Sequence, residues 1–160
     1  MSIQRVRDYF RPLDRESDIK EFPVSSATVE LAARAVGVIP ARIAKTLSFL
    51  VEDRCILIVA AGDAKVDNSK YKALFHTKAK MLSPEPVGVL TGHAIGGVCP
   101  FANPEDVKTY LDLSLRRFDT VFPAAGSSNS AIELTCEELE QFSRSAGWID
   151  VCKGWQECEI

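Results

Sequence analysis

The stretch TGHAIGGVCPF at residues 91–101 gathers residue types that could do chemistry: three glycines, a histidine, a cysteine and a proline within eleven positions. Glycine allows backbone conformations that other residues avoid, and it lets another molecule approach the backbone closely. The stretch therefore predicts either a sharp turn or a loop that cradles a ligand. Taken alone, it is more typical of a turn that redirects the chain between two elements.

Cys99 and His93 could form a nucleophile and its base, but a thiol without a catalytic role is the more common situation. The chain has five cysteines and two histidines, and none of them shows C-x-x-C or metal-ligand spacing. We therefore expect no disulfide framework, no metal and no cofactor. A cysteine hydrolase built on Cys99 and His93 is the weakest of the functional hypotheses.

The net charge of the chain is −3, which argues against a protein that coats nucleic acid. A local basic segment is still present, because five lysines and a histidine lie between residues 65 and 80 with one acidic residue, Asp67. By itself this segment is more typical of a solvated helix face than of a surface that contacts phosphates.

Length and composition predict a single domain of residues 1–160, in which residues 1–21 form an N-terminal extension. With 160 residues, 46% of them hydrophobic, the chain can bury one substantial core. The first residues lack the apolar segment of a signal peptide, and the longest apolar run, CILIVAAG, is too short to cross a membrane. We expect a cytoplasmic protein that does not act at a membrane.

Helical spacing and capping residues predict four helices, the last with a capping box from Thr135 to Glu138. They are VSSATVELAARAVG (24–37), VDNSKYKALF (66–75), SPEPVGVLTG (83–92) and TCEELEQFSRSAG (135–147). Pro40 suits the first turn of a further short helix, so Lys45 is expected at the junction of that helix with a strand.

Alternating and continuous apolar runs predict the strands, of which the first two are expected to form a hairpin. The strands are TLSFLVE (46–52), CILIVAAG (55–62), VKTYLDLSL (107–115), DTVFPAAG (119–126), SAIELT (130–135) and WIDVCKGW (148–155). Strands and helices mix without regular alternation, which favours an α+β fold with a mixed, largely antiparallel sheet surrounded by helices.

Three segments, ARIAKTLSFLVE, TGHAIGGVCPF and FPAAGSSNSAIELTCEEL, resemble in this order the YbaK/EbsC family, the free-standing relatives of the editing domain of prolyl-tRNA synthetase. The resemblance covers nearly the whole chain from about Phe22 onward, and it implies a barrel-like sheet. Its most specific parts are Lys45 and the G-x-x-x-P signature from Gly96 to Pro100. It implies hydrolysis of the ester in mischarged aminoacyl-tRNA, usually tRNA for proline carrying a small wrong amino acid such as cysteine, alanine or serine.

The resemblance also implies an active site at Lys45 and the glycine-rich loop. Lys45 alone is more typical of a surface lysine whose stem covers apolar neighbours. In the family, the matching lysine holds the terminal nucleotide or the aminoacyl group, and its charge could stabilise a developing oxyanion. Backbone N–H groups of Gly96, Gly97 and Val98 could stabilise that oxyanion as well, each by about 2.7–4 kcal/mol. Water or the substrate itself would supply the nucleophile.

The residues expected to bind substrate are Thr46, His93, Pro100, Phe101, Ser128 and Ser130. The best-known branch of the family has a basic, glycine-rich run where this chain has PAAGSSNS, so the sequence does not give the amino acid removed. It also does not distinguish Ser128 from Ser130 as the pocket residue.

The partners implied by the resemblance are the acceptor end of aminoacyl-tRNA and prolyl-tRNA synthetase. We expect Lys70, Lys72 and Lys78 to contact the tRNA backbone. The alternative from another class is a non-catalytic module that holds the 3′ end of aminoacyl-tRNA or a nucleotide-like ligand in the same cleft.

Overall fold

The structure, a computed structural model of the chain, describes residues 2–93 and 98–155. Its α-helices are α1 (Ser2–Phe10), α2 (Val29–Val36), α3 (Asn68–Phe75), α4 (Pro84–Thr91) and α5 (Cys136–Phe142). Its strands are β1 (Lys20–Glu21), β2 (Ile43–Val51), β3 (Arg54–Ala61), β4 (Lys65–Val66), β5 (Lys108–Asp112), β6 (Thr120–Pro123), β7 (Ser130–Ala131), β8 (Leu134–Thr135), β9 (Gly147–Ile149) and β10 (Cys152–Lys153). Short 3₁₀ helices lie at Arg11–Leu13, Glu16–Asp18, Pro40–Arg42 and Leu113–Arg117.

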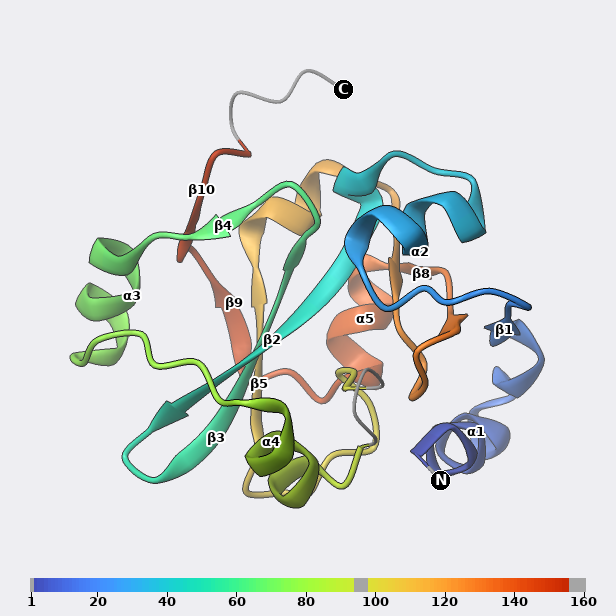
Figure 1. Cartoon of the computed structure of the whole chain (residues 1–160), viewed down its shortest axis with the longest axis horizontal. Coiled ribbons are helices and arrows are strands. Elements are labelled where there is room, and N and C mark those ends of the chain that lie inside the picture. The colour runs from blue at the N-terminus through green and yellow to red at the C-terminus, as the bar shows by residue number, and fades with distance from the viewer. Residues whose placement is uncertain (1, 94–97, 156–160) are drawn as a thin grey trace.

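A curled sheet with the strand order β8-β6-β2-β3-β5-β9 forms the centre of the molecule, and the helices lie around it (Figure 1). The predicted hairpin is confirmed, because β2 and β3 pair antiparallel from Ala44↔Ala61 to Val51↔Arg54. Glu52 and Asp53 in its turn have positive φ angles of 50° and 64°, as a type I′ turn requires. The predicted α+β class with a mixed sheet is also confirmed.

The sheet contains more parallel pairing than the sequence pattern predicted. β2 pairs parallel with β6, and β5 lies parallel between β3 and β9. Parallel neighbours require a long crossover connection, and the chain between β3 and β5 provides one that contains α3 and α4. Strand patterns reveal where strands occur but not which of them become neighbours across such a connection.

Several predicted elements are shorter or divided. α2 begins at Val29 rather than near residue 24, because Oγ1 of Thr28 accepts the backbone N–H of Leu31 and caps the helix there. The capping box of α5 is confirmed, but the helix ends at Phe142, and Gly147 already belongs to β9. α3 and α4 begin and end within two residues of their predictions.

Two predicted strands are each two strands in the structure. The segment 130–135 is divided into β7, which pairs with β1, and β8, which pairs with β6. The segment 148–155 is divided between β9, at the edge of the central sheet, and β10, which pairs with β4. Each segment has the sequence pattern of one strand, but its two halves pair with different strands.

The core lies on both faces of β3, whose residues 55–61 are all buried. α1 contributes to this core from a segment for which the sequence predicted no helix: Val6 and Phe10 have no exposed surface. Leu139 and Phe142 of α5 pack into the same cluster. Within residues 2–93 and 98–155, no helix has the length and apolarity needed to cross a membrane.

Candidate active site

A pocket with a volume of about 200 Å³ lies where the beginning of β2 meets the end of β6, strand β7 and the segment that leads into α2. Most of its lining side chains are small or carry a hydroxyl group. The lining consists of Ser26, Ala27, Thr28, Val29, Ala32, Ile43, Ala44, Lys45, Thr46, Val98, Phe122, Ala124, Ser130 and Ala131. Lys45 is the charged residue among them, so its charge dominates the field that a small ligand would meet there.

Lys45 lies within β2, because this strand begins at Ile43, directly after the 3₁₀ helix Pro40–Arg42. The predicted helix-to-strand junction is therefore two residues earlier in the chain. The Lys45 backbone pairs with Ala60 of β3. Its Nζ donates hydrogen bonds to two carbonyl oxygens in the loop after β3, those of Gly62 at 3.4 Å and Ala64 at 2.5 Å. Strand and loop thus hold the two ends of one side chain.

The loop that accepts these hydrogen bonds is fixed by close packing and by an ion pair. A Cβ atom at Gly62 would lie 2.1 Å from the carbonyl oxygen of Pro40 and 2.6 Å from Cγ1 of Val29, so this position requires glycine. At the next residue, the carboxylate of Asp63 accepts both Nη groups of Arg117, at 2.6 and 3.0 Å. Such bidentate pairs have a defined geometry, and the carbonyls that face Lys45 are therefore held in place.

Burial lowers the pKa of the Lys45 ammonium, while the carboxylate of Asp63 acts in the opposite direction. A protonated lysine has three N–H donors and no acceptor. With two of these donors directed at Gly62 and Ala64, one donor remains for a bound group. The arrangement favours a positioned cation over a mobile surface lysine.

The hydroxyl groups around the pocket differ in their hydrogen bonding. Oγ1 of Thr46 is buried and has no hydrogen-bond partner among the described residues. Ser130 is 1% exposed, and its Oγ accepts the hydroxyl of Ser127 at 2.8 Å. Ser128 is exposed and lies outside the pocket lining, where its carbonyl oxygen accepts the N–H of Ser26. Of the two serines that the sequence left open, the structure brings Ser130 to the pocket.

The glycine-rich loop reaches the pocket through Val98, which belongs to its lining. Gly96 and Gly97, predicted to act with Val98, lie outside the described residues. Pro100 and Phe101 are buried and are not part of this lining, although the sequence predicted both to bind substrate. Their burial indicates a role in fixing the end of the loop to the core.

His93 joins the two ends of this loop and does not line the pocket. It is 2% exposed, and its Nε2 lies 2.9 Å from the carbonyl oxygen of Phe101. Because a carbonyl only accepts hydrogen bonds, we assign the ring proton to Nε2. Burial and the neighbouring guanidinium of Arg5 lower the pKa of His93 to about 4, so the ring is neutral near pH 7.

The geometry argues against a cysteine hydrolase built on Cys99 and His93. Cys99 has no exposed surface, and burial raises the pKa of its thiol to about 12. Its Sγ lies 3.7 Å from Nε2 of His93, but that nitrogen donates its proton to Phe101 and cannot accept another. Neither residue lines the Lys45 pocket. Cys99 is a small core residue in this arrangement.

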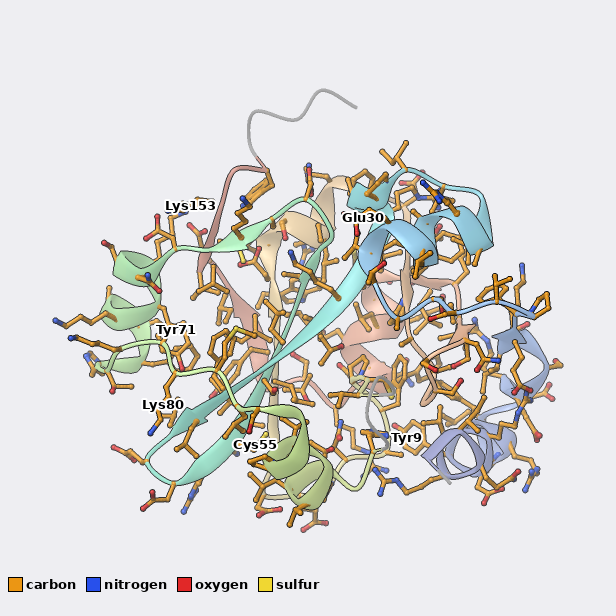
Figure 2. The ribbon with its side chains drawn as sticks, viewed as in Figure 1. Tyr9, Glu30, Cys55, Tyr71, Lys80 and Lys153 are labelled. Atoms are coloured by element: carbon orange, nitrogen blue, oxygen red, sulfur yellow. The ribbon has the colours of Figure 1, made fainter. Side chains whose placement is uncertain are left out.

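The three lysines predicted to contact tRNA fall into two groups. Nζ of Lys70 donates to Asp150 and to the carbonyl oxygen of Cys152, each at 3.0 Å. Lys72 and Lys78 are exposed and line a common hollow beside α3. Lys80, which follows them in the chain, points outward at the periphery of the molecule (Figure 2). Lys72 and Lys78 are therefore better placed than Lys70 to meet a phosphate.

In residues 2–93 and 98–155, no group of three His, Cys, Asp or Glu side chains is arranged to hold a metal ion. Sequence reasoning missed the carbonyl oxygens of Gly62 and Ala64 that hold Lys45. A glycine directly after a buried strand was a signal for close backbone approach, but its partners lie in distant segments.

The comparisons with known proteins place this geometry in a family. The family model described as aminoacyl-tRNA editing domain matches residues 24–142, which include the pocket. The uncharacterised protein YwhH of Bacillus subtilis (strain 168) is 60% identical over 157 residues, 98% of this chain and 100% of that protein. A proline–tRNA ligase of Lysinibacillus sphaericus (strain C3-41) is 29% identical over 90 residues, which are 56% of this chain and 16% of the ligase.

A solved structure supports the same assignment. It is described as a candidate trans-editing enzyme for prolyl tRNA synthetase, and it superposes with a TM-score of 0.84 at 30% identity, covering 96% of this chain and 98% of that one. The structural match extends over the curled sheet and its helices, and the family match contains Lys45 and the loop that ends at Pro100. This chain therefore belongs to the aminoacyl-tRNA editing domain family.

Proposed function

We propose that this protein hydrolyses mischarged aminoacyl-tRNA in trans, and that its substrate is tRNA for proline carrying cysteine, alanine or serine. The observation that carries the proposal is Lys45, a partly buried cation that two carbonyls hold in a pocket of about 200 Å³ lined by small side chains. A synthetase pocket discriminates one methylene by only about 1–3 kcal/mol. A second, small site that removes small wrong amino acids compensates for that limit.

The proposed reaction is attack of water on the carbonyl carbon of the ester, after which the 3′ oxygen of the tRNA leaves with a proton and the amino acid is released. The remaining N–H of Lys45 holds the terminal ribose or the ester carbonyl. Backbone N–H groups of Gly96, Gly97 and Val98 stabilise the oxyanion. Thr46, whose buried hydroxyl lacks a partner among the described residues, hydrogen-bonds the polar part of the aminoacyl group.

The proposed partners follow from this substrate. The acceptor end of tRNA enters the pocket, and Lys72 and Lys78 contact the phosphate backbone. The likeness to part of a proline–tRNA ligase supports prolyl-tRNA synthetase as the source of the mischarged tRNA. We propose that the protein acts in the cytoplasm, where aminoacyl-tRNA is formed and used.

A deacylation panel tests the proposal. The purified protein is incubated with tRNA for proline that carries alanine, serine, cysteine or proline, and the remaining ester is followed with time. We expect at least one of the three small esters to be hydrolysed well above the rate without protein, and the prolyl ester to be spared because a site that removed the correct amino acid would cancel the work of the synthetase. Absence of hydrolysis for all four esters would contradict the proposal.

The alternative is a module that binds the aminoacylated 3′ end without hydrolysing it. The buried hydroxyl of Thr46 fits a binding role as well as a catalytic one. Equilibrium binding measured with a non-hydrolysable amide-linked analogue separates the two functions. Tight binding of this analogue together with an intact ester in the panel would favour the binding module.

A further inference from the structure

Helix α1 lies outside the part of the chain that the family model matches, which begins at residue 24. The helix is nevertheless built into the core, because Val6 and Phe10 have no exposed surface. The hydroxyl group of Tyr9, labelled in Figure 2, donates to the carbonyl oxygen of Phe142 in α5 at 2.7 Å. α1 is therefore a fixed element and could hold whatever it contacts.

Arg5 of α1 contacts the beginning of the glycine-rich loop. Its Nη2 donates to the carbonyl oxygen of Thr91 at 2.7 Å and lies 3.4 Å from Nε2 of His93. The residue between these two makes room for the guanidinium, since a Cβ at Gly92 would lie 2.2 Å from Nη1 of Arg5. Gly92 also has a φ of 77°, which favours glycine.

Phe10 of the same helix contacts the end of the loop. Its ring meets the ring of Phe101 edge to face, with centroids 4.9 Å apart and an interplanar angle of 71°. The carbonyl oxygen of Phe101 is the group that His93 binds from the other end of the loop. Helix α1, His93 and Phe101 thus form a closed set of contacts around the base of the loop.

We propose that α1 is a clamp for the loop and that Arg5 and Phe10 are positioning residues, which hold the two ends of residues 91–101 so that Val98 remains at the Lys45 pocket. That α1 holds the loop does not depend on the proposed function, whereas the expected effect on the deacylation rate rests on it. Displacing a reacting or stabilising group by about 1 Å can cost about a hundredfold in rate. A helix outside the family match thereby acts on catalysis without touching the substrate.

The test compares Arg5→Met with Arg7→Met, a matched control on the same helix. Methionine retains much of the arginine stem but loses the donors and the charge. Arg7 is a suitable control because its guanidinium pairs with Glu21 of β1 rather than with the loop. Arg5→Lys is the third variant, because it keeps the positive charge near His93 and loses the planar guanidinium whose Nη2 donates to the carbonyl oxygen of Thr91.

The first readout is the titration of the histidine rings by NMR, which is simple because the chain contains two histidines and His76 is exposed. In Arg5→Met we expect the pKa of His93 to rise from its value of about 4, since the neighbouring positive charge is gone. We also expect the methyl signals of Val98 to shift. Both signals should stay unchanged in Arg7→Met, and Arg5→Lys should keep the low pKa of His93 while the Val98 signals still shift.

The second readout is the kinetics of deacylation. We expect Arg5→Met to lower kcat by about tenfold to a hundredfold with KM nearly unchanged, because loop position affects the transition state more than substrate binding. Folded Arg5→Met with unchanged Val98 signals, or with shifted signals and a normal kcat, would overturn the positioning role. If the wild-type protein has no deacylase activity, the proposed function fails, while the Val98 and His93 signals still decide whether α1 clamps the loop.

Discussion

Lys45 and the glycine-rich loop approach the same pocket from supports of different kinds. Lys45 lies on a strand in the middle of the central sheet, and its ammonium rests on carbonyls just beyond the end of the strand that pairs with it. The loop is held instead by α1, a helix more than eighty residues earlier in the chain. One support is built by local hairpin geometry and the other by long-range packing.

This difference affects how each part of the site can fail. β2 and β3 pair along nearly their whole length. A substitution just beyond the end of β3 can therefore move Lys45 only by disrupting the close packing around it. A loop held at its two ends can change shape when either end is released. We therefore expect substitutions that disturb the packing around Lys45 to lower both the deacylation rate and the free energy of unfolding. Substitutions at the base of the loop can lower one of these without the other.

The largest expected stability effect concerns the loop and comes from His93. Its folded pKa of about 4 lies below the value of about 6.5 expected when unfolded, so the unfolded chain binds the proton more readily. The stability that comes from a neutral His93 is present above pH 6.5 and is lost as the pH falls towards 4. The difference between these two pKa values corresponds to about 3 kcal/mol in the free energy of unfolding.

His93→Gln checks this effect, since Gln keeps a donor for the Phe101 carbonyl but does not titrate. Denaturant unfolding at pH 7 and at pH 4 should show a much smaller acid loss in the variant than in the wild-type protein. Equal acid losses in both proteins would show that His93 is not the group responsible.

The next effect concerns the support of Lys45. Gly62→Ala places a Cβ against Pro40, so we expect a loss of about 1–3 kcal/mol in the free energy of unfolding together with a fall in kcat. Gly88→Ala is the matched control, because its Cβ would lie 3.4 Å from the carbonyl oxygen of His93, an ordinary contact, and alanine favours the helix. A normal kcat in folded Gly62→Ala would show that the position of the loop after β3 does not affect catalysis.

The smallest effect concerns a surface outside both supports. Replacing Lys72 and Lys78 by glutamate should weaken tRNA binding and flatten its salt dependence by about 0.7–0.9 in logarithmic slope for each phosphate that is no longer neutralised. Rate at saturating substrate should not change. Lys70→Glu should have less effect on binding, because its ammonium is engaged by Asp150 and Cys152. A lower rate at saturating substrate in the double variant would contradict a role of Lys72 and Lys78 in binding alone.

The sequence predicted those parts of the molecule that depend on neighbours in the chain. The β2–β3 hairpin, the capping box at Thr135 and the place of Lys45 near the start of a strand all follow from local patterns. The inward position of Ser130 rather than Ser128 did not, since the short strand β7 pairs with β1 from the N-terminal segment. Ser128 lies before this strand and Ser130 lies within it, so the point where β7 begins decides which serine is buried.

His93 and Phe101 show the same limit more strongly. The family resemblance implied that both residues bind substrate, but the structure buries them beside helix α1, where Arg5 lies near His93 and Phe10 contacts Phe101. No pattern within residues 91–101 reveals contacts made by a helix at the other end of the chain. Whether a residue of such a loop faces a ligand or the core depends on which distant segments of the chain pack against it.

The most direct test of the proposed active site is the single-turnover rate of deacylation by Lys45→Ala compared with Lys108→Ala. Lys108 is an exposed lysine on β5 of the same sheet and lies outside the pocket lining, so its loss controls for charge and for strand substitution. With both variants folded, we predict a fall of about a hundredfold or more for Lys45→Ala and a normal rate for Lys108→Ala. A near-normal rate for Lys45→Ala at saturating protein would contradict the assignment of this pocket as the site of hydrolysis.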